Sequence, residues 1–458
     1  MKKISVLIMM CLSMFLLNAI SLEDSIELAK RQNKEMLAEK SGLEAAEWSR
    51  KNALTNFLPK VSFNSMLVRI DDDTYKQATE IYQLPVFGPT GIPTGDFIPF
   101  SAGTLSGGFY KTSFSNDITV RQPVFNGGKV ILGYQLSALA KQQAELVVIG
   151  KEKDLAFAVA STYLNLLKLL DLQTLSRKSL NSTLAHLVNV QKKYELGIAN
   201  KSALLQWQVK QKNDETALRQ IDNNIAALKE YWHYLLGSEE EMLPDRIDIR
   251  KYDSEISIYA GMDEAQIISE IERFLAAVQK SSPALQTLDL VDRIMKKNYD
   301  LAKGNFLPSL NLQYTYQIEN DDKFDFDGQD NWSLAAVFSL PVFQSGANYT
   351  NLKKAKHEKK KAGLETAWVR DTYLIAAQNS MRTQLINAQI VEDNRSALEF
   401  AAENHRILSE LFEQGLITNS ELLDAQTMLF GSEMNLTAAY YDYILSKYEV
   451  KKYIRQEE

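Results

Sequence analysis

One fifteen-residue phrase occurs twice in this chain, and this repetition constrains the fold more than any other feature. Tyr194–Gln208 and Phe412–Gln426 are identical at six of fifteen positions, with a constant separation of 218 residues. In each copy a glycine interrupts a long helical pattern, which predicts a tip where one helix ends and another returns. We therefore expect a duplicated fold. Matching tip positions are Gly197, Ser202, Leu204 and Leu205 in the first copy, and Gly415, Ser420, Leu422 and Leu423 in the second.

The second tip carries two acids that the first tip lacks. Ser420 is predicted to be the helix N-cap, and Glu421 and Asp424 follow it closely. Their spacing of three residues places both carboxylates on one face of the returning helix. Acids at the start of a helix also complement its dipole, and residue pattern alone favours this structural interpretation.

The first 21 residues have the pattern of a secretory leader. Lys2 and Lys3 precede an apolar run from Ile4 to Leu17, and small residues follow. Cleavage is expected after Ala19 or Ser21. The only cysteine, Cys11, lies inside this leader, which excludes a disulfide framework in the mature chain. No later stretch holds about 18 consecutive apolar residues, so we expect an exported chain without a membrane-spanning helix.

A second duplicated pattern joins helices to strands. Helical periodicity over 22–56 and 271–305 ends each time in the phrase Asn-Phe-Leu-Pro, now with an offset of 249 residues. Alternating strands are predicted after it, at about 60–70, 114–124, 309–318 and 332–342. The third is the clearest, with Leu310, Leu312 and Tyr314 alternating with polar residues. About ten residues is the length of an outer-membrane barrel strand, although a soluble half-buried sheet alternates in the same way. The connection 71–113 is expected to be a long irregular loop on the outer side.

Each second strand is expected to end at a joint that redirects the chain into a helix. The two joints share the pattern Pro-Val-Phe followed by glycine, with Pro123, Gly127 and Gly128 in one copy and Pro341 and Gly346 in the other. Proline-free helices over 129–196 and 347–414 follow. Helices of that length need partners along them, which indicates coiled-coil packing with return helices over 202–236 and 420–455.

These patterns predict four segments: a leader (1–21), a first structural repeat (22–236), a connecting segment (237–262) and a second structural repeat (263–458). No catalytic constellation accompanies them. The four histidines stand singly without metal-ligand spacing, and no nucleophile motif occurs, so neither an enzyme nor a cofactor or metal site is expected. The net charge of −7 argues against a nucleic-acid partner.

Taken together, the leader, the duplicated order of elements, the Phe-Leu-Pro entries, the Pro-Val-Phe joints and the Gly–Ser–Leu-Leu tips resemble the TolC family of outer-membrane efflux channels. The resemblance implies an α+β membrane protein that forms a homotrimer. Four strands per chain would build one 12-stranded barrel, continued by a periplasmic α-helical tunnel. It also implies the outer membrane of a Gram-negative bacterium, with a periplasmic adaptor and an inner-membrane transporter of the RND, ABC or MFS type as partners.

The same resemblance implies a role for the tips. They would be the periplasmic entrance where the adaptor docks, and Glu421 and Asp424 would form the constriction. In the family, polar links between the two tips can lock the closed state. The positions that would form this polar lock are held here by Ile417 and Ala203. The aromatic residue at the other linking position is Phe412, which has no hydroxyl. We therefore predict that this polar lock is absent. Closure of the entrance would then rely on packing and on the ring of Glu421 and Asp424 carboxylates from the three copies.

A soluble periplasmic coiled-coil scaffold or adaptor is the alternative function. It predicts extraction without detergent, whereas a duct predicts a detergent-requiring trimer. The transported substrate (drugs, metals or proteins) and the identity of the transporter are not specified by the sequence.

Overall fold

The computed structural model describes residues 18–101, 110–238, 242–320 and 326–454. Most of the expected leader therefore lies outside the described residues. The chain is an α+β protein that divides into two compact units, and each unit draws on both sequence repeats. A helical unit comprises the segment up to Ala46, Ala140–Arg293 and Lys361–Glu458, and a sheet unit comprises Glu47–Leu139 and Ile294–Lys360.

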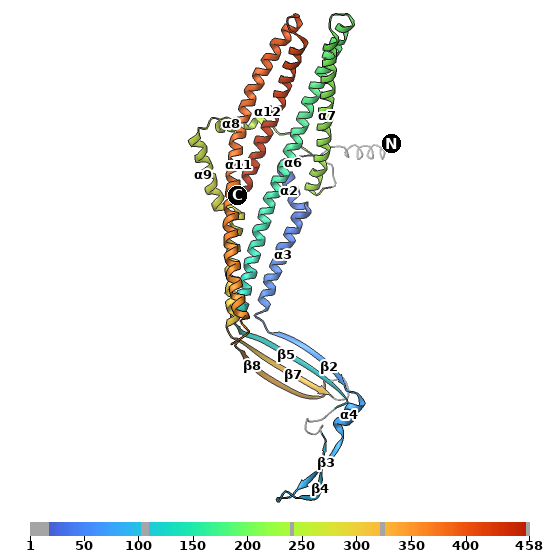
Figure 1. Ribbon diagram of the computed structural model, residues 1–458, viewed down its shortest axis with the longest axis vertical. Coiled ribbons are helices and arrows are strands. Elements are labelled where there is room, and N and C mark those ends of the chain that lie inside the picture. The colour runs from blue at the N-terminus through green and yellow to red at the C-terminus, as the bar shows by residue number, and fades with distance from the viewer. Residues whose placement is uncertain (1–17, 102–109, 239–241, 321–325, 455–458) are drawn as a thin grey trace, which may run out of the picture. The chain divides into compact units, whose positions relative to one another are not determined.

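Two long helical hairpins form the helical unit (Figure 1). Helix α6 (Lys129–Glu195) returns as α7 (Lys201–Leu236), and α11 (Ala347–Glu413) returns as α12 (Asn419–Tyr453). The hairpins share one core. Its fully buried members include Tyr163 of α6, Trp232 of α7, Val391 of α11 and Tyr443 of α12. Lateral packing of this kind supplies the partners that helices of this length require.

One helix of the described chain, α6, contains an apolar window long enough to cross a membrane by length and composition. Of that window, 44% is buried inside the protein. A buried core helix passes the same test, and α6 contributes buried side chains to the core that it shares with α7, α11 and α12.

The helices at the start of each repeat are each broken once. In the first repeat α2 (Leu22–Gln32) ends at Asn33 and α3 (Lys34–Thr55) follows; the Asn33 amide donates to the Leu235 carbonyl at 3.0 Å. In the second repeat α9 (Glu264–Ser281) gives way to α10 (Pro283–Lys303), with proline at the first helical position. The expectation of single helices over 22–56 and 271–305 was therefore wrong at these two breaks.

The connecting segment forms its own small elements. Strand β6 (Met242–Pro244) pairs in parallel with β1 (Asn18–Ile20), and η2 (Ile249–Tyr252) leads into α8 (Asp253–Ala260). The Arg395 guanidinium of α11 binds the Asp253 carboxylate at 2.8 Å, so the segment packs on the second hairpin. The cleavage expected after Ala19 or Ser21 would fall inside or just beyond β1.

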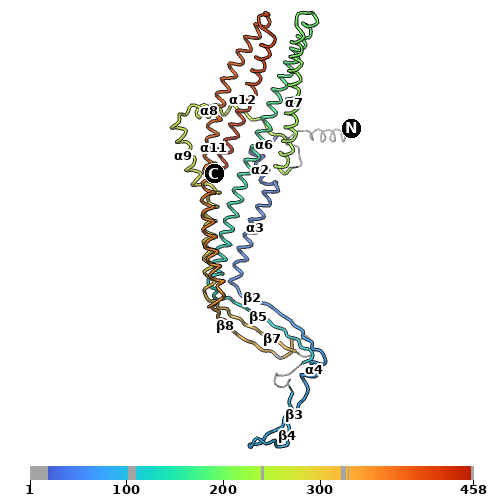
Figure 2. Tube along the Cα trace, viewed as in Figure 1, coloured from blue at the N-terminus to red at the C-terminus, as the bar shows by residue number. Residues whose placement is uncertain are grey.

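A four-stranded antiparallel sheet of order β2-β5-β7-β8 forms the sheet unit (Figure 2). Its strands are β2 (Lys60–Arg69), β5 (Thr112–Asn126), β7 (Ser309–Asn320) and β8 (Gln329–Ser339); η3 (Gly304–Phe306) precedes β7. The last strand stops three residues short of the expected end, before Pro341. The connection expected to be irregular instead holds α4 (Asp72–Thr79) and a hairpin of β3 (Ile81–Phe87) with β4 (Pro93–Ser101). Residues 102–109 of it lie outside the described residues.

Register gives the sheet two chemically different faces. On one face the cross-strand row Phe63, Ile118, Tyr316 and Trp332 is apolar, and so is the adjacent row Val61, Val120, Tyr314 and Leu334. The adjacent row on the other side is mostly polar, with Ile318 among Ser65, Asn116 and Asp330. On the other face polar side chains pair across strands. The Asn64 amide donates to Asp117 at 2.9 Å, and Thr119 and Thr315 hydroxyls lie 3.3 Å apart. Alternation along each strand thus becomes one apolar and one hydrogen-bonded surface.

Candidate functional site

The two predicted tips have the same backbone construction. Gly197 and Gly415 both adopt left-handed φ angles, 74° and 73°. In each tip the residue after the glycine donates its N–H back to a carbonyl five residues earlier: Ile198 to Lys193 at 2.8 Å, and Leu416 to Leu411 at 2.9 Å. This is the pattern of a glycine-terminated helix, and glycine is required because its φ is positive.

The second returning helix is capped two residues earlier than the sequence suggested. Thr418, not Ser420, is the N-cap of α12, and it forms a capping box with Glu421. Asn200 caps α7 by accepting from the Ala203 N–H at 2.8 Å. Ser420 and Ser202 lie inside the first turn. The prediction of Ser420 as N-cap was wrong. The Thr418 hydroxyl oxygen accepts from the Glu421 N–H, so the helix begins two residues earlier than a Ser420 cap would allow.

Glu421 and Asp424 are both exposed on α12. One Glu421 carboxylate oxygen accepts from the Thr418 backbone N–H and from its hydroxyl, each at 2.7 Å. These two hydrogen bonds lower the pKa of Glu421. In a single copy of the chain, therefore, Glu421 serves as a capping residue. Asp424, one turn further along, takes no part in the cap.

A polar link that the sequence analysis missed joins the two tips. The Trp207 Nε1–H of α7 donates to the Asn419 Oδ1 of α12 at 2.6 Å, and the indole ring is fully buried. The His186 ring of α6 stacks on that indole with 4.8 Å between centroids. Burial, and then the neighbouring His405, lower the pKa of His186, which favours the neutral imidazole.

Apolar packing surrounds this link. Val190, Leu204 and Trp207 form a buried cluster, with Leu423 of the second tip packed against it. Ala203, at one of the positions where the family's polar lock would fall, also packs against this cluster. The repeat-related Leu204 and Leu422 are both buried. Leu205 is about half exposed, whereas its counterpart Leu423 packs against the cluster. The Lys193 ammonium nitrogen lies 5.0 Å from the centroid of the Phe412 ring, which is a cation–π contact between the tips.

No local pattern in the sequence indicates the tryptophan–asparagine link. Trp207 and Asn419 are 212 positions apart, and the repeat offset relates them to Ala425 and Lys201, which have different chemistry. The only available signal was that an indole in a polar helix is usually buried and needs an acceptor for its N–H.

The two joints lie in the sheet unit and differ in one residue. Gly127 and Gly128 have φ of 66° and 76°, and at the matching positions Ser345 and Gly346 have 50° and 78°. A Cβ on Gly127 would meet the Gly304 carbonyl oxygen at 2.4 Å, whereas a Cβ on Gly128 meets nothing within 4 Å. Gly127 is thus required by close packing as well as by its φ. Pro123 lies at a bulge of the β5–β7 ladder, and Pro341 follows β8.

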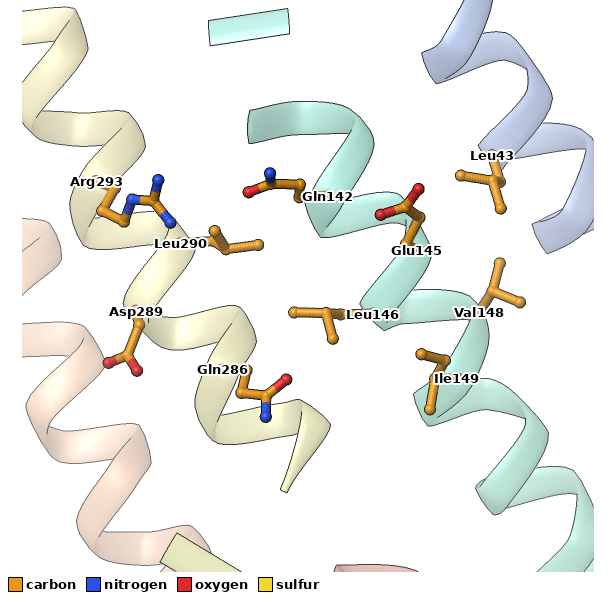
Figure 3. Close-up of a pocket in the computed structure, with 10 residues that line it drawn as sticks. All are labelled: Leu43, Gln142, Glu145, Leu146, Val148, Ile149, Gln286, Asp289, Leu290 and Arg293. Carbon is orange, nitrogen blue, oxygen red and sulfur yellow. The ribbon is translucent and has the colours of Figure 1, made fainter. Parts of the chain in front are cut away.

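A groove of about 730 Å³ lies between α3, α6 and α10 in the helical unit (Figure 3). Leu43, Leu146 and Leu290 contribute apolar side chains from the three helices. Its carboxylates are bound elsewhere, since Asp289 pairs with Arg370 at 2.7 Å and Glu145 with Lys141 at 3.3 Å. The groove has no set of groups suited to catalysis. Within the described ranges, histidines and acids form no group of three or more able to hold a metal ion.

Comparison with known proteins gives consistent matches. Residues 275–454 match the family model of the outer membrane efflux proteins. The outer membrane protein TolC of Vibrio cholerae is 22% identical over 329 residues, which are 68% of this chain and 70% of that protein. Among solved structures, the Campylobacter jejuni CmeC outer membrane channel aligns with a TM-score of 0.74 at 15% identity, over 94% of this chain and 85% of that one. The Vibrio cholerae outer membrane protein VceC aligns with a TM-score of 0.72 at 14% identity, over 94% and 95%.

Proposed function

This chain belongs to the TolC-like outer membrane efflux proteins, and from that premise we propose that it acts as the outer-membrane exit duct of a tripartite efflux or type I secretion system. It resides in the outer membrane and extends into the periplasm. Three copies would each give four strands to one 12-stranded barrel, which a tunnel of the long helices continues. A periplasmic adaptor and an inner-membrane transporter of the RND, ABC or MFS type would deliver the substrate.

The observation that carries this proposal is the division of the β2-β5-β7-β8 sheet into one apolar and one polar face. In a barrel wall, the apolar face meets lipid and the polar face lines a water-filled lumen. The apolar side chains are exposed in a single copy, Trp332 and Phe338 to about two thirds. The soluble scaffold function is not favoured, because it leaves such a face in water. A passive duct also requires no catalytic or cofactor site.

The tips are proposed as the adaptor-docking entrance, with Glu421 and Asp424 as its acidic constriction. Three copies around one axis would bring six carboxylates together, and such a ring favours cations and slows anions. Neighbouring carboxylates raise one another's pKa, whereas the capping hydrogen bonds lower the pKa of Glu421. The cap therefore helps to keep the ring charged.

Reconstitution of the purified protein in planar bilayers tests the duct. The expected result is discrete, cation-preferring conductance from a detergent-extracted, heat-modifiable trimer. The double variant Glu421→Ala/Asp424→Ala should conduct with reduced cation preference. Unchanged selectivity would remove the constriction from these two residues and leave the duct intact. Extraction of the mature protein without detergent, with no conductance, would contradict the duct itself.

A further inference from the structure

A run of lysines follows the second joint, and neither the joint nor the proposed entrance involves it. Residues 347–361, the start of α11, hold six lysines and one acid, in a chain whose net charge is −7. The six are Lys353, Lys354, Lys356, Lys359, Lys360 and Lys361. All of them are exposed. Such a concentration of positive charge on a helix surface attracts anions from outside the chain.

Three of these lysines form one stripe with a tyrosine. The members follow one another at spacings of four, three and four residues, which places them along one face of α11: Tyr349, Lys353, Lys356 and Lys360. The Lys353 ammonium nitrogen lies 5.2 Å from the centroid of the Tyr349 ring. Among the described residues, no carboxylate forms an ion pair with Lys356 or Lys360, whereas Lys354 and Lys361 have glutamates of their own helix at 3.7 and 3.6 Å. Like charges at these spacings repel one another, so the stripe is stabilised by an external anion.

The first repeat shows that the fold does not need these lysines. The offset of 218 relates the three lysines of the stripe to uncharged residues of α6, namely Gln135, Ala138 and Gln142. Gln135 accepts from the Lys297 ammonium of α10 at 2.8 Å, so this position of the first repeat is bound inside the chain. The same helical positions are therefore built without charge in one repeat. The charge in the other repeat has a role besides folding.

The order of side chains before the stripe is that of a membrane surface. The apolar alternation of β8 continues past its end to Val342, and both Val342 and Phe343 are more than four fifths exposed. Tyr349 follows, about three fifths exposed, and Lys353 comes one helical turn later. An apolar band, an aromatic belt and basic contacts to headgroups succeed one another in this order at a bilayer surface. The lysines of the stripe lie about 9 to 20 Å along α11 from its start, at the depth of the headgroups and of the water just beyond them.

We infer that Lys353, Lys356 and Lys360 bind the headgroup phosphates of anionic glycerophospholipids at the periplasmic surface of the outer membrane. The inference rests on the proposed duct, which places the apolar face of the sheet in the bilayer and the start of α11 on its periplasmic side. Two other occupants match less of the surface. The same stripe of a second copy would be repelled by its charge. A soluble anion would match the lysines and leave the exposed Val342 and Phe343 in water, whereas a lipid matches both.

Lipid binding to the assembled protein tests this inference. Protein purified in a neutral detergent is titrated with phosphatidylglycerol, and bound lipid is counted by native mass spectrometry. The triple variant Lys353→Gln/Lys356→Gln/Lys360→Gln should bind phosphatidylglycerol about tenfold more weakly or worse, because each lysine near an anionic surface strengthens binding roughly fivefold. The triple variant with arginine at the same positions keeps the charge and should bind as the wild type does.

The matched control is Lys34→Gln/Lys212→Gln/Lys280→Gln, because it removes three exposed lysines that belong to the helical unit. Its affinity for phosphatidylglycerol should equal that of the wild type. An equal loss of affinity in the two glutamine variants would overturn the inference, since binding would then follow net charge alone. Displacement of the lipid by inorganic phosphate at constant ionic strength would also overturn it, by showing that the stripe is a site for a soluble anion.

Bilayer recordings separate the failure of this inference from the failure of the proposed duct. Lysines that contact lipid do not line the lumen, so the triple glutamine variant should keep the wild-type cation preference in bilayers of a zwitterionic lipid. A higher cation preference there would place the lysines in the lumen and overturn the inference, while the duct stands. Protein that binds phosphatidylglycerol through the three lysines but shows no conductance would retain the lipid site and lose the duct.

Discussion

The Trp207 Nε1–H donates a 2.6 Å hydrogen bond to Asn419 Oδ1 and so joins the tip of the first repeat to the tip of the second. Both groups belong to the region where the chain is proposed to open. The link lies beside a buried cluster that spans the tips, and it is made within one copy of the chain. Opening the entrance by separating the two hairpins would have to break it.

Replacing Asn419 with alanine should loosen the tips. The substitution removes the acceptor of a buried indole N–H, which costs about 1 kcal/mol or more and corresponds to a roughly fivefold increase in the open population. Limited proteolysis of the tip turns, followed over time, measures this. Asn394→Ala is the control, since that amide donates to the Ile390 carbonyl of its own helix. Equal proteolysis of the two variants would show that the link does not hold the tips together.

The tip should become less stable as the pH falls through the range where histidine titrates. Burial lowers the pKa of His186, so the unfolded chain binds a proton at a higher pH than the folded tip does. Stability is therefore full above the ordinary histidine pKa of about 6.5 and falls below it, until the folded pKa is reached. Hydrogen exchange of the segment 186–207 at about pH 7.5 and about pH 5.5 measures the loss.

His186→Phe is the informative variant for that pH dependence, because it keeps an aromatic ring on Trp207 and removes the titrating group. Hydrogen exchange of the segment 186–207 in this variant should differ less between the two pH values, after correction for the intrinsic amide exchange rates. His405 lies close enough to affect the pKa of His186, so His405→Phe should give a smaller change in the same direction. A wild-type-like pH dependence in His186→Phe would exclude this histidine as its source.

Thr418→Ala should separate the capping role of the second tip from its charge. The substitution removes an N-cap oxygen, and such losses cost about 1 kcal/mol of helix stability. Both acids remain, so the cation preference near neutral pH should stay that of the wild type while the tip melts at lower temperature. A loss of cation preference in Thr418→Ala would mean that the cap, and not the charge alone, sets selectivity.

The same variant has a defined effect at acid pH. The Thr418 hydroxyl is one of two donors that lower the pKa of Glu421, so removing it should raise that pKa. A carboxylate with a lowered pKa stabilises the fold above its ordinary value of about 4.3 and loses this contribution as the pH falls through the lowered value. On acidification, Thr418→Ala should therefore lose cation preference at a higher pH than the wild type. Bilayer recordings over a pH series would detect the shift.

Two adjacent glycines of the first joint should respond differently to alanine. Gly128→Ala adds only the cost of a left-handed φ, about 1 kcal/mol. Gly127→Ala adds that cost and also forces a Cβ against the Gly304 carbonyl oxygen. We expect Gly127→Ala to lower the yield of heat-modifiable oligomer strongly and Gly128→Ala to lower it mildly. Ser345→Gly, which relieves a positive φ, should be neutral or stabilising. Equal yields from the two alanine variants would contradict the close approach.

Elements with a local signal were predictable. The alternation from Leu310 to Ile318 predicted β7, and the proline-free patterns predicted the four long helices to within two residues at each end. The hairpin of β3 and β4 was not predicted, because its prolines and glycines are also typical of an irregular loop. The break at Asn33 was missed for another reason: its amide bonds to a carbonyl more than 200 residues away.

By itself, then, the sequence determined the duplication, the period of the long segments and the position of the two tips, because these depend on residues close together in the chain. Gly197 and Gly415 mark the tips wherever the rest of the chain lies, since only glycine adopts their φ freely. Tertiary structure decided what the tips do with their side chains. It selected Thr418 over Ser420 as the cap and brought Trp207 to Asn419. Such contacts between distant residues depend on how whole helices pack, which no local pattern encodes.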